Sequence, residues 1–174
     1  MNANLFARFD AAFGEHLTKP CLRLANGDTW TYGDLQRETA CLAAALRSEG
    51  VGHGDRVVVR VPKTPEALAL YLATLQVGGV YVPLNTDYTD LEVAYFLDDA
   101  SPSLLSTGND MEVGVATFTL DEHGGGSLKQ LASSLDPESQ VATRSDDDLA
   151  AILYTSGTTG RSKGAMLTLS LIHI

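Results

Sequence analysis

The stretch RVVVRVPKTPEALALYLATLQVGGVYVP, residues Arg56 to Pro83, decides the fold. It opens with a β-branched run over residues 56–61, which is typical of a strand buried on both faces. Thr64 and the proline after it form a helix start, because threonine caps free N–H groups and proline suits the first turn. The helix predicted over residues 65–76 is apolar on nearly all sides, so we expect it to be well buried. A glycine pair ends this helix, and residues 80–83 form the next predicted strand.

The same pattern continues downstream and sets the fold class. Thr89 and Glu92 have the spacing of a capping box, which opens a predicted helix that extends to about Ala100. A further strand is predicted over residues 103–106. Strand, helix, strand, helix, strand at these lengths implies right-handed βαβ crossovers. The sequence therefore predicts an α/β fold with a mainly parallel sheet and flanking helices.

Weaker patterns flank this unit on both sides. They predict, in order, a helix over residues 5–13, a hairpin of residues 21–24 and 29–31, a helix from residue 32 to about 49, a strand over 115–120, a helix over 127–135 and a strand over 149–154. Residues 136–148, before the last of these, are polar and acidic. We interpret them as a solvated surface connection.

The composition argues against several classes of partner. The 174 residues carry 22 acidic and 12 basic side chains, a formal net charge of −10. Without a basic run, nucleic acid and anionic membrane surfaces are not expected partners. No apolar stretch approaches the roughly 18 residues of a membrane span, and the N-terminus lacks the apolar segment of a signal peptide. Cys21 and Cys41 stand apart without a CxxC pair, which favours reduced thiols and a cytoplasmic location.

A segment rich in glycine and hydroxyl groups follows the strand predicted over residues 149–154. It is TSGTTGRSKG, Thr155 to Gly164, with three glycines and five hydroxyls in ten residues. Glycines let backbone N–H groups turn toward an anion, hydroxyls add donors, and Lys163 supplies a positive charge for a polyphosphate. The end of a strand is also where α/β sheets usually bind ligands. The segment indicates a phosphate-binding loop, with a flexible linker or a plain surface turn as the alternative.

A Walker A loop, the motif of P-loop hydrolases, does not fit this segment. That motif places its lysine after a glycine and before serine or threonine, whereas Ser162 precedes Lys163 and Gly164 follows it. Residues 164–168 also look like a strand rather than the helix that follows a Walker A loop. A GxGxxG dinucleotide fingerprint is absent.

Three stretches resemble motifs of the acyl-adenylate-forming, or AMP-binding, superfamily. YTSGTTGRSKG (residues 154–164) is similar to its phosphate-binding loop, LQVGGVYVPLN (residues 75–85) to its upstream core motif, and WTYGDL (residues 30–35) to its early TYxEL element. The resemblance covers residues 5–168 in consistent order. It implies that residues 1–168 form an incomplete N-terminal part of the family's large AMP-binding domain.

Two features depart from the common family pattern. Most members have proline before the loop lysine, but this chain has Ser162. With PLNTDYT (residues 83–89), this departure resembles the malonyl-CoA synthetase branch. The last six residues, LSLIHI (residues 169–174), stand where the family continues with a His-Gly-Asn type turn. They resemble one reading frame of a transposon-end adapter used in sequencing libraries, so we interpret them as a non-native tail.

The resemblance implies an ATP-dependent acid–thiol ligase. A carboxylate attacks the α-phosphate of Mg-ATP to give an acyl-adenylate and pyrophosphate, and a thiol, usually that of CoA, then displaces AMP. The residues that match the loop holding the β- and γ-phosphates are Thr155, Ser156, Gly157, Thr158, Thr159, Gly160 and Lys163. The catalytic residues, the Mg²⁺-binding glutamate and the acyl pocket are expected beyond residue 168. The fragment alone is therefore expected to be inactive and to hold no metal site.

Other hypotheses stay open at this point. Another acyl-CoA ligase or adenylation domain of the same superfamily is one, and a non-catalytic phosphate-binding module is a second, from a different functional class. The histidines show no metal-ligand spacing and are interpreted as surface or structural residues: His16, His53, His123 and His173. The acidic run over residues 146–148 is interpreted as helix-cap and loop residues rather than metal ligands.

Overall fold

The computed structural model of the chain describes residues 2–155 and 162–172. Six strands form one sheet in the order β6-β5-β3-β4-β7-β8. These strands are β3 (Arg56–Arg60), β4 (Val80–Pro83), β5 (Leu104–Thr107), β6 (Ala116–Thr119), β7 (Leu149–Thr155) and β8 (Lys163–Thr168). All neighbouring pairs are parallel except β7 with β8, which is antiparallel. The predicted α/β fold with a mainly parallel sheet is confirmed.

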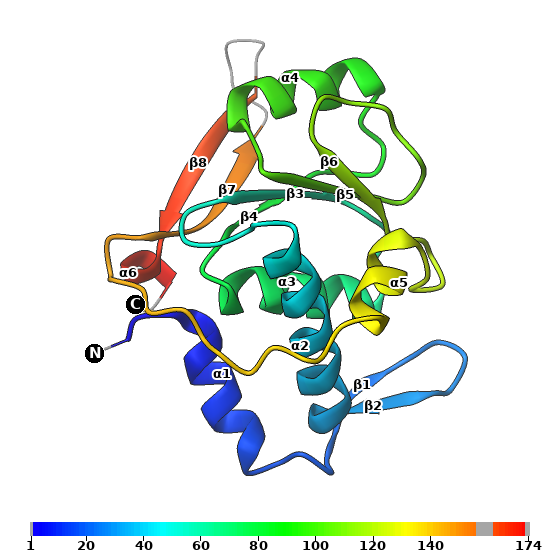
Figure 1. The fold of residues 1–174 in the computed structure, drawn as a ribbon, viewed down its shortest axis with the longest axis vertical. Coiled ribbons are helices and arrows are strands. Elements are labelled where there is room, and N and C mark those ends of the chain that lie inside the picture. Colours follow the sequence, from blue (N-terminus) through cyan, green and yellow to red (C-terminus); the bar gives the residue numbers. More distant parts are fainter. Residues whose placement is uncertain (1, 156–161, 173–174) are drawn as a thin grey trace.

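Helices cover both faces of this sheet (Figure 1). They are α1 (Leu5–Gly14), α2 (Tyr32–Ser48), α3 (Pro65–Gln76), α4 (Asp90–Ala100), α5 (Ser127–Ser133) and the short α6 (Leu169–Ile172). The antiparallel hairpin of β1 (Pro20–Arg23) and β2 (Thr29–Thr31) stands apart from the sheet. In the part of the chain that the structure describes, no helix combines the length and the apolar character needed to cross a membrane.

Threonine caps fix where three of the helices begin. The hydroxyls of Thr31, Thr64 and Thr89 each accept a hydrogen bond from a backbone N–H in the first helical turn. For α2 and α4 the bond is reciprocated, since Asp34 and Glu92 accept from the backbone N–H of the capping threonine. Hydrogen bonds from these threonines also hold the pKa of both carboxyl groups below its usual range. The capping box predicted for Thr89 and Glu92 is therefore present, and Thr31 and Asp34 form a second one.

The core divides into two clusters because β3 is buried on both faces. Val57 and Val59 point into the larger cluster, formed with α1, α2, α3 and α5, while Val58 points into the smaller one beneath α4. All three valines are at most 3% exposed. This agrees with the continuous apolar run from which the strand was predicted. Figure 1 shows the same division, with α4 alone on one side of the sheet.

Phe96 is the centre of the cluster under α4. Its side chain is 2% exposed, and its ring centroid lies 4.9 Å from that of Tyr88 and 4.6 Å from that of Tyr154 on β7. Aromatic pairs at such separations add to the free energy gained by burying their area. Phe96 thus joins α4 to the strand that leads into the glycine-rich segment.

Residues 136–148 contain no helix or strand, as predicted, but the expectation of a wholly solvated connection is wrong. Arg144 is 5% exposed, and its guanidinium donates to the carbonyl oxygens of Gly78 at 2.5 Å and Leu149 at 3.1 Å. Its Nε atom lies 3.2 Å from a carboxylate oxygen of Asp148. The segment therefore ties the C-terminal end of α3 to the start of β7. Burial without pairing would be costly for a charge, and these partners satisfy it.

We expect Phe96→Ala to lower the free energy of unfolding by about 3–5 kcal/mol, the range for large-to-small changes at buried aromatic positions. Leu91→Ala is the matched control on the same helix, because Leu91 is 86% exposed; its effect should stay within about 0.5 kcal/mol. Urea unfolding followed by circular dichroism measures both. A loss below about 1 kcal/mol for Phe96→Ala would contradict the central role of this ring.

Candidate phosphate-binding site

The hairpin of β7 and β8 carries the glycine-rich segment at its tip. The two strands are paired from Leu149 with Thr168 up to Thr155 with Lys163. β7 is parallel to β4, so its C-terminal end at Thr155 lies at the carboxyl edge of the sheet. This edge is where open α/β sheets bind their ligands.

The structure brings two of the predicted phosphate-binding residues together. Thr155 and Lys163 are cross-strand partners at the last pair of the ladder, and both are exposed. The other predicted residues lie outside the described part of the chain: Ser156, Gly157, Thr158, Thr159 and Gly160. Arg161 also lies outside it.

The predicted strand after the loop is confirmed as β8, which begins at Lys163 itself. A Walker A lysine would instead stand at the start of a helix. Gly164, the next residue, is needed for close packing of the hairpin. A Cβ atom at this position would lie 2.8 Å from Cγ2 of Ile152, closer than real Cβ atoms come. Glycine therefore lets β8 approach β7 immediately after the lysine.

Helix α4 fixes both ends of the loop through two tyrosine hydroxyls. On the exit side, the hydroxyl of Tyr95 donates to the carbonyl oxygen of Ser162 at 2.9 Å. On the entry side, the hydroxyl of Tyr154 donates to a carboxylate oxygen of Asp99 at 2.5 Å. Tyr95 and Asp99 stand four residues apart, so they lie on the same face of α4. We call these two bonds the α4 clamp.

The environment of Tyr154 keeps its hydroxyl a donor. Burial raises the pKa of this phenol well above its ordinary value, and the hydrogen bond and negative charge of Asp99 raise it further. The phenol therefore stays protonated at neutral pH and can donate to the carboxylate. No sequence pattern predicted this role for Tyr95, Asp99 and Tyr154. The only available signal was a capped helix with tyrosine beside its buried face, which does not identify a partner far along the chain.

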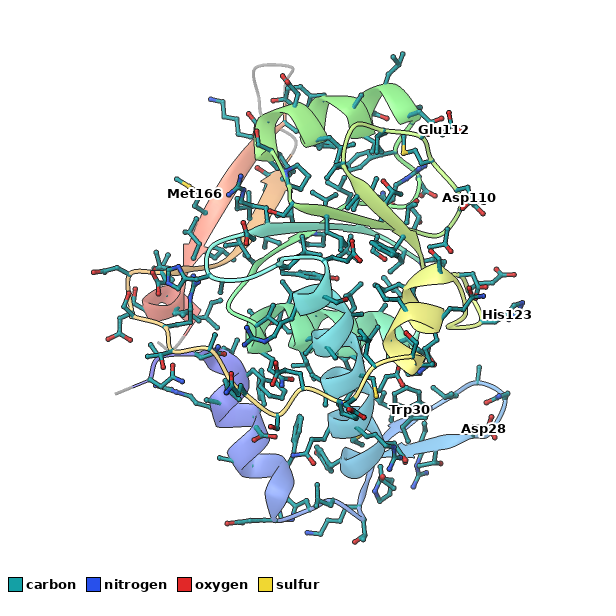
Figure 2. All side chains as sticks on the ribbon, viewed as in Figure 1. Asp28, Trp30, Asp110, Glu112, His123 and Met166 are labelled. Carbon is teal, nitrogen blue, oxygen red and sulfur yellow. The ribbon has the colours of Figure 1, made fainter. Side chains whose placement is uncertain are left out.

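The histidines with described positions lie in surface or structural settings, as interpreted from the sequence. His53 approaches Asp148 at 3.3 Å, and His16 makes a 2.7 Å hydrogen bond with the carbonyl of Glu15. His123 points outward from a turn (Figure 2). Across residues 2–155 and 162–172, no three His, Cys, Asp or Glu side chains gather to hold a metal ion. Cys21 and Cys41 are free thiols, as predicted.

Comparison with known proteins decides the family. The sequence profile of the AMP-binding enzymes matches residues 9–173. The chain belongs to the AMP-binding enzyme family. Among the solved structures of relatives, ATP-bound MatB from Rhodopseudomonas palustris matches with a TM-score of 0.87 and 43% sequence identity. The match covers 97% of this chain and 35% of MatB.

Curated members of the AMP-binding family include enzymes with different names. Feruloyl-CoA synthase of Amycolatopsis sp is 38% identical over 148 residues, which are 82% of this chain and 29% of that enzyme. Tyrocidine synthase 3 of Brevibacillus parabrevis is 35% identical over 148 residues, 81% of this chain and 2% of that protein. The chain thus spans less than a third of either relative.

We expect Tyr95→Phe to loosen the exit side of the hairpin, because it removes one hydrogen bond and nothing else. Hydrogen–deuterium exchange of the amides in β8 should accelerate about fivefold, which corresponds to a bond of about 1 kcal/mol. Tyr88→Phe is the matched control, since the Tyr88 ring packs on Phe96 but its hydroxyl belongs to neither bond of the clamp. Equal exchange in the two variants would show that the Tyr95 bond does not hold the hairpin.

Proposed function

We propose that the intact AMP-binding protein carrying this sequence is an ATP-dependent acid–thiol ligase, converting malonate, ATP and CoA to malonyl-CoA, AMP and pyrophosphate. The observation that carries the proposal is the placement of Thr155 opposite Lys163 at the carboxyl edge of the sheet. Between them the chain carries the segment that resembles the family's phosphate-binding loop. The family match and the 43% identity to ATP-bound MatB support nucleotide binding at this hairpin.

The proposed reaction has two balanced steps. First, a carboxylate oxygen of the acid bonds to the α-phosphorus of ATP, and the bond to the β-phosphate bridging oxygen breaks, releasing pyrophosphate. Second, the thiol sulfur of CoA bonds to the acyl carbon, the bond to the AMP oxygen breaks, and the thiol proton is released to solvent. Negative charge builds up on the pyrophosphate in the first step, so groups that stabilise this charge accelerate it.

Lys163 has the clearest proposed role. Its ammonium group, exposed at the start of β8, would meet the β- and γ-phosphates and offset their charge. Thr155 would donate a hydroxyl from the other side of the tip. Ser156, Gly157, Thr158, Thr159 and Gly160 are proposed to complete the cradle with backbone N–H groups and hydroxyls.

Magnesium is not assigned to residues of this chain. The described residues gather no metal-binding cluster, and the family's magnesium-binding glutamate is expected beyond residue 168. Bound to ATP, the ion would supply charge neutralisation of the phosphates. The α4 clamp would keep the hairpin in register while the nucleotide binds and leaves, because it holds β7 and β8 from outside the loop.

Malonate is proposed as the acid because of the branch that the sequence resembles. Ser162 before the lysine and the PLNTDYT segment over residues 83–89 carry that resemblance. Feruloyl-CoA synthase and tyrocidine synthase 3 are also relatives, so an aromatic acyl-CoA ligase or an adenylation domain is the alternative within the family.

We expect Lys163→Ala in the intact protein to slow ATP–pyrophosphate exchange by about 100-fold or more, the usual loss on removing one group that stabilises transition-state charge. Lys19→Ala is the matched control, because Lys19 is exposed and lies far along the chain from the hairpin. A rate of ATP–pyrophosphate exchange within about twofold of the parent's would contradict the proposed role of Lys163 in phosphate binding. Nucleotide binding without any exchange in the parent would favour the non-catalytic module instead.

We expect the intact protein to prefer malonate over acetate, octanoate and benzoate by at least about 100-fold in kcat/KM. A dicarboxylate needs a second anion site, so we expect an arginine in the acyl pocket, beyond residue 168. Leaving that arginine buried and unpaired penalises a monocarboxylate. AMP formation with each acid measures the preference. Equal or better turnover of octanoate or benzoate would rule out malonate as the preferred substrate. It would leave the assignment as an adenylate-forming enzyme intact.

A further inference from the structure

Two arginines of β3 contact the two ends of α4. Side chains alternate along a strand, so residues 56, 58 and 60 of β3 point to the same face of the sheet. Val58 belongs to the core cluster beneath α4, which places Arg56 and Arg60 on the α4 side as well. The central strand thus presents arginine, valine and arginine to the helix that forms the α4 clamp.

Arg56 holds the C-terminal end of α4. Its Nε donates to the carbonyl oxygen of Ala100 at 2.8 Å, and its Nη2 donates to the carbonyl oxygen of Ser101. These carbonyls stand where an α-helix leaves its own acceptors free and where a positive charge is favourable. The C-terminal end of α4 is therefore held at the amino end of the central strand.

Arg60 holds the segment that leads into the N-terminal end of α4. Its Nη2 donates to the carbonyl oxygens of Tyr88 at 2.6 Å and of Thr86 at 3.2 Å. Its Nη1 lies 3.6 Å from a carboxylate oxygen of Asp90, but that carboxylate is exposed, so the ion pair contributes little. The two contacts to backbone oxygens place the start of α4 at the carboxyl end of β3.

The guanidinium of Arg60 is directed at the backbone rather than at a ligand. The two hydrogens of Nη2 are used by the two carbonyl oxygens, and Nε is buried without a hydrogen-bond partner in the described part of the chain. An arginine that binds a phosphate uses two adjacent N–H groups as a fork. Arg60 does not present such a fork, so we expect it to act through α4 and not on the phosphates of ATP.

Directional contacts decide where α4 lies along the strand. Burial of its apolar face against Val58 is non-directional, so it allows small shifts of the helix along β3. Hydrogen bonds do not allow them, because a contact of about 3.6 Å no longer counts as a hydrogen bond. The bond from Tyr95 to the carbonyl oxygen of Ser162 measures 2.9 Å, so a shift of about 1 Å is enough to break it.

We propose that Arg60 is a positioning residue for the hairpin of β7 and β8. By holding the segment before α4, it sets the position of the helix along β3. Through the bond from Tyr95, the helix then sets where β8 begins, at Lys163. Arg56 secures the other end of the helix. The consequence for catalysis rests on the proposed function, whereas the positioning itself can be measured without nucleotide.

The first test measures hydrogen–deuterium exchange of the β8 amides in the Arg60→Met variant of the intact protein. Methionine keeps an apolar stem but removes every donor. Because the effect passes through the clamp, we expect an acceleration close to that of Tyr95→Phe, about three- to fivefold. In a protein that already carries Tyr95→Phe, Arg60→Met should add less than about 1.5-fold, since the route to the hairpin is then interrupted.

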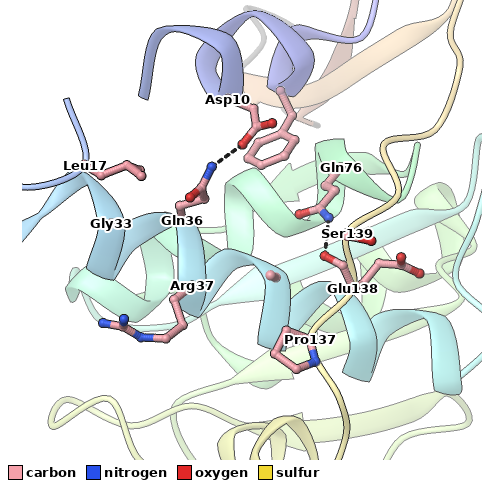
Figure 3. A pocket seen from close by; sticks show the side chains of 11 residues that line it. Asp10, Leu17, Gly33, Gln36, Arg37, Gln76, Pro137, Glu138 and Ser139 are labelled. Atoms are coloured by element: carbon pink, nitrogen blue, oxygen red, sulfur yellow. Dashed lines mark hydrogen bonds between the residues drawn. The ribbon is translucent and has the colours of Figure 1, made fainter. Parts of the chain in front are cut away.

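Arg47→Met is the matched control. Arg47 is also half-buried, and its Nε lies 2.8 Å from a carboxylate oxygen of Glu138. Glu138 lines a pocket beside α1 and α2 (Figure 3), on the face of the sheet opposite α4. The change should leave hydrogen exchange in β8 within about 1.5-fold of the parent's, because the two sites share no partner. Thermal unfolding of each variant checks that the fold is kept.

The second test separates the hydrogen bonds of Arg60 from its charge. Arg60→Met should slow ATP–pyrophosphate exchange at least about tenfold, because a group misplaced by about 1 Å can lose about 100-fold in rate. Arg60→Lys keeps the positive charge but lacks the planar guanidinium that holds both carbonyl oxygens. We therefore expect the lysine variant to recover only a small part of the lost rate.

Three results would overturn the proposal. Equal hydrogen exchange in β8 for Arg60→Met and Arg47→Met would mean that Arg60 contributes only to general stability. An equal acceleration by Arg60→Met with and without Tyr95 would mean that it does not act through the clamp. Full recovery of the rate by Arg60→Lys would mean that its charge acts on the phosphates directly. An intact parent without ATP–pyrophosphate exchange would contradict the proposed function, while hydrogen exchange in β8 would still decide the positioning role.

Discussion

The burial of β3 on both faces is the constraint on which the rest of the architecture depends. Its three valines need apolar cover above and below, so the helix after β3 and the helix after β4 take opposite sides of the sheet. This division leaves α4 alone over the face that β7 shares. From there Phe96 packs on Tyr154, and the α4 clamp reaches both sides of the hairpin. The candidate phosphate site is thus positioned by the same packing that stabilises the central strand.

Local patterns were enough to predict most of the elements. The helix over residues 65–76 was predicted to the residue because both of its ends carry local signals, a threonine cap before it and glycines after it. The strand after the loop was also predicted, because residues 164–168 carry no helix start. Its antiparallel direction was not predicted, since strand direction depends on the partner rather than on the strand's own sequence.

The features that the sequence did not reveal all join residues far apart in the chain. The guanidinium of Arg144 meets a carbonyl 66 residues away, and Tyr95 meets one 67 residues away. No periodicity records such contacts, because they arise only when the helices have packed.

The hydrogen bond on the exit side of the α4 clamp does not depend on the side chain at residue 162. Tyr95 bonds to the carbonyl oxygen of Ser162, an atom that every amino acid provides, proline included. Exchange between the serine of this chain and the proline common in the family therefore preserves the contact. The residue before the lysine can vary, because the hydrogen bond from Tyr95 needs only its carbonyl oxygen. The position before Lys163 can therefore change in sequence while the hydrogen bond beside the lysine is kept.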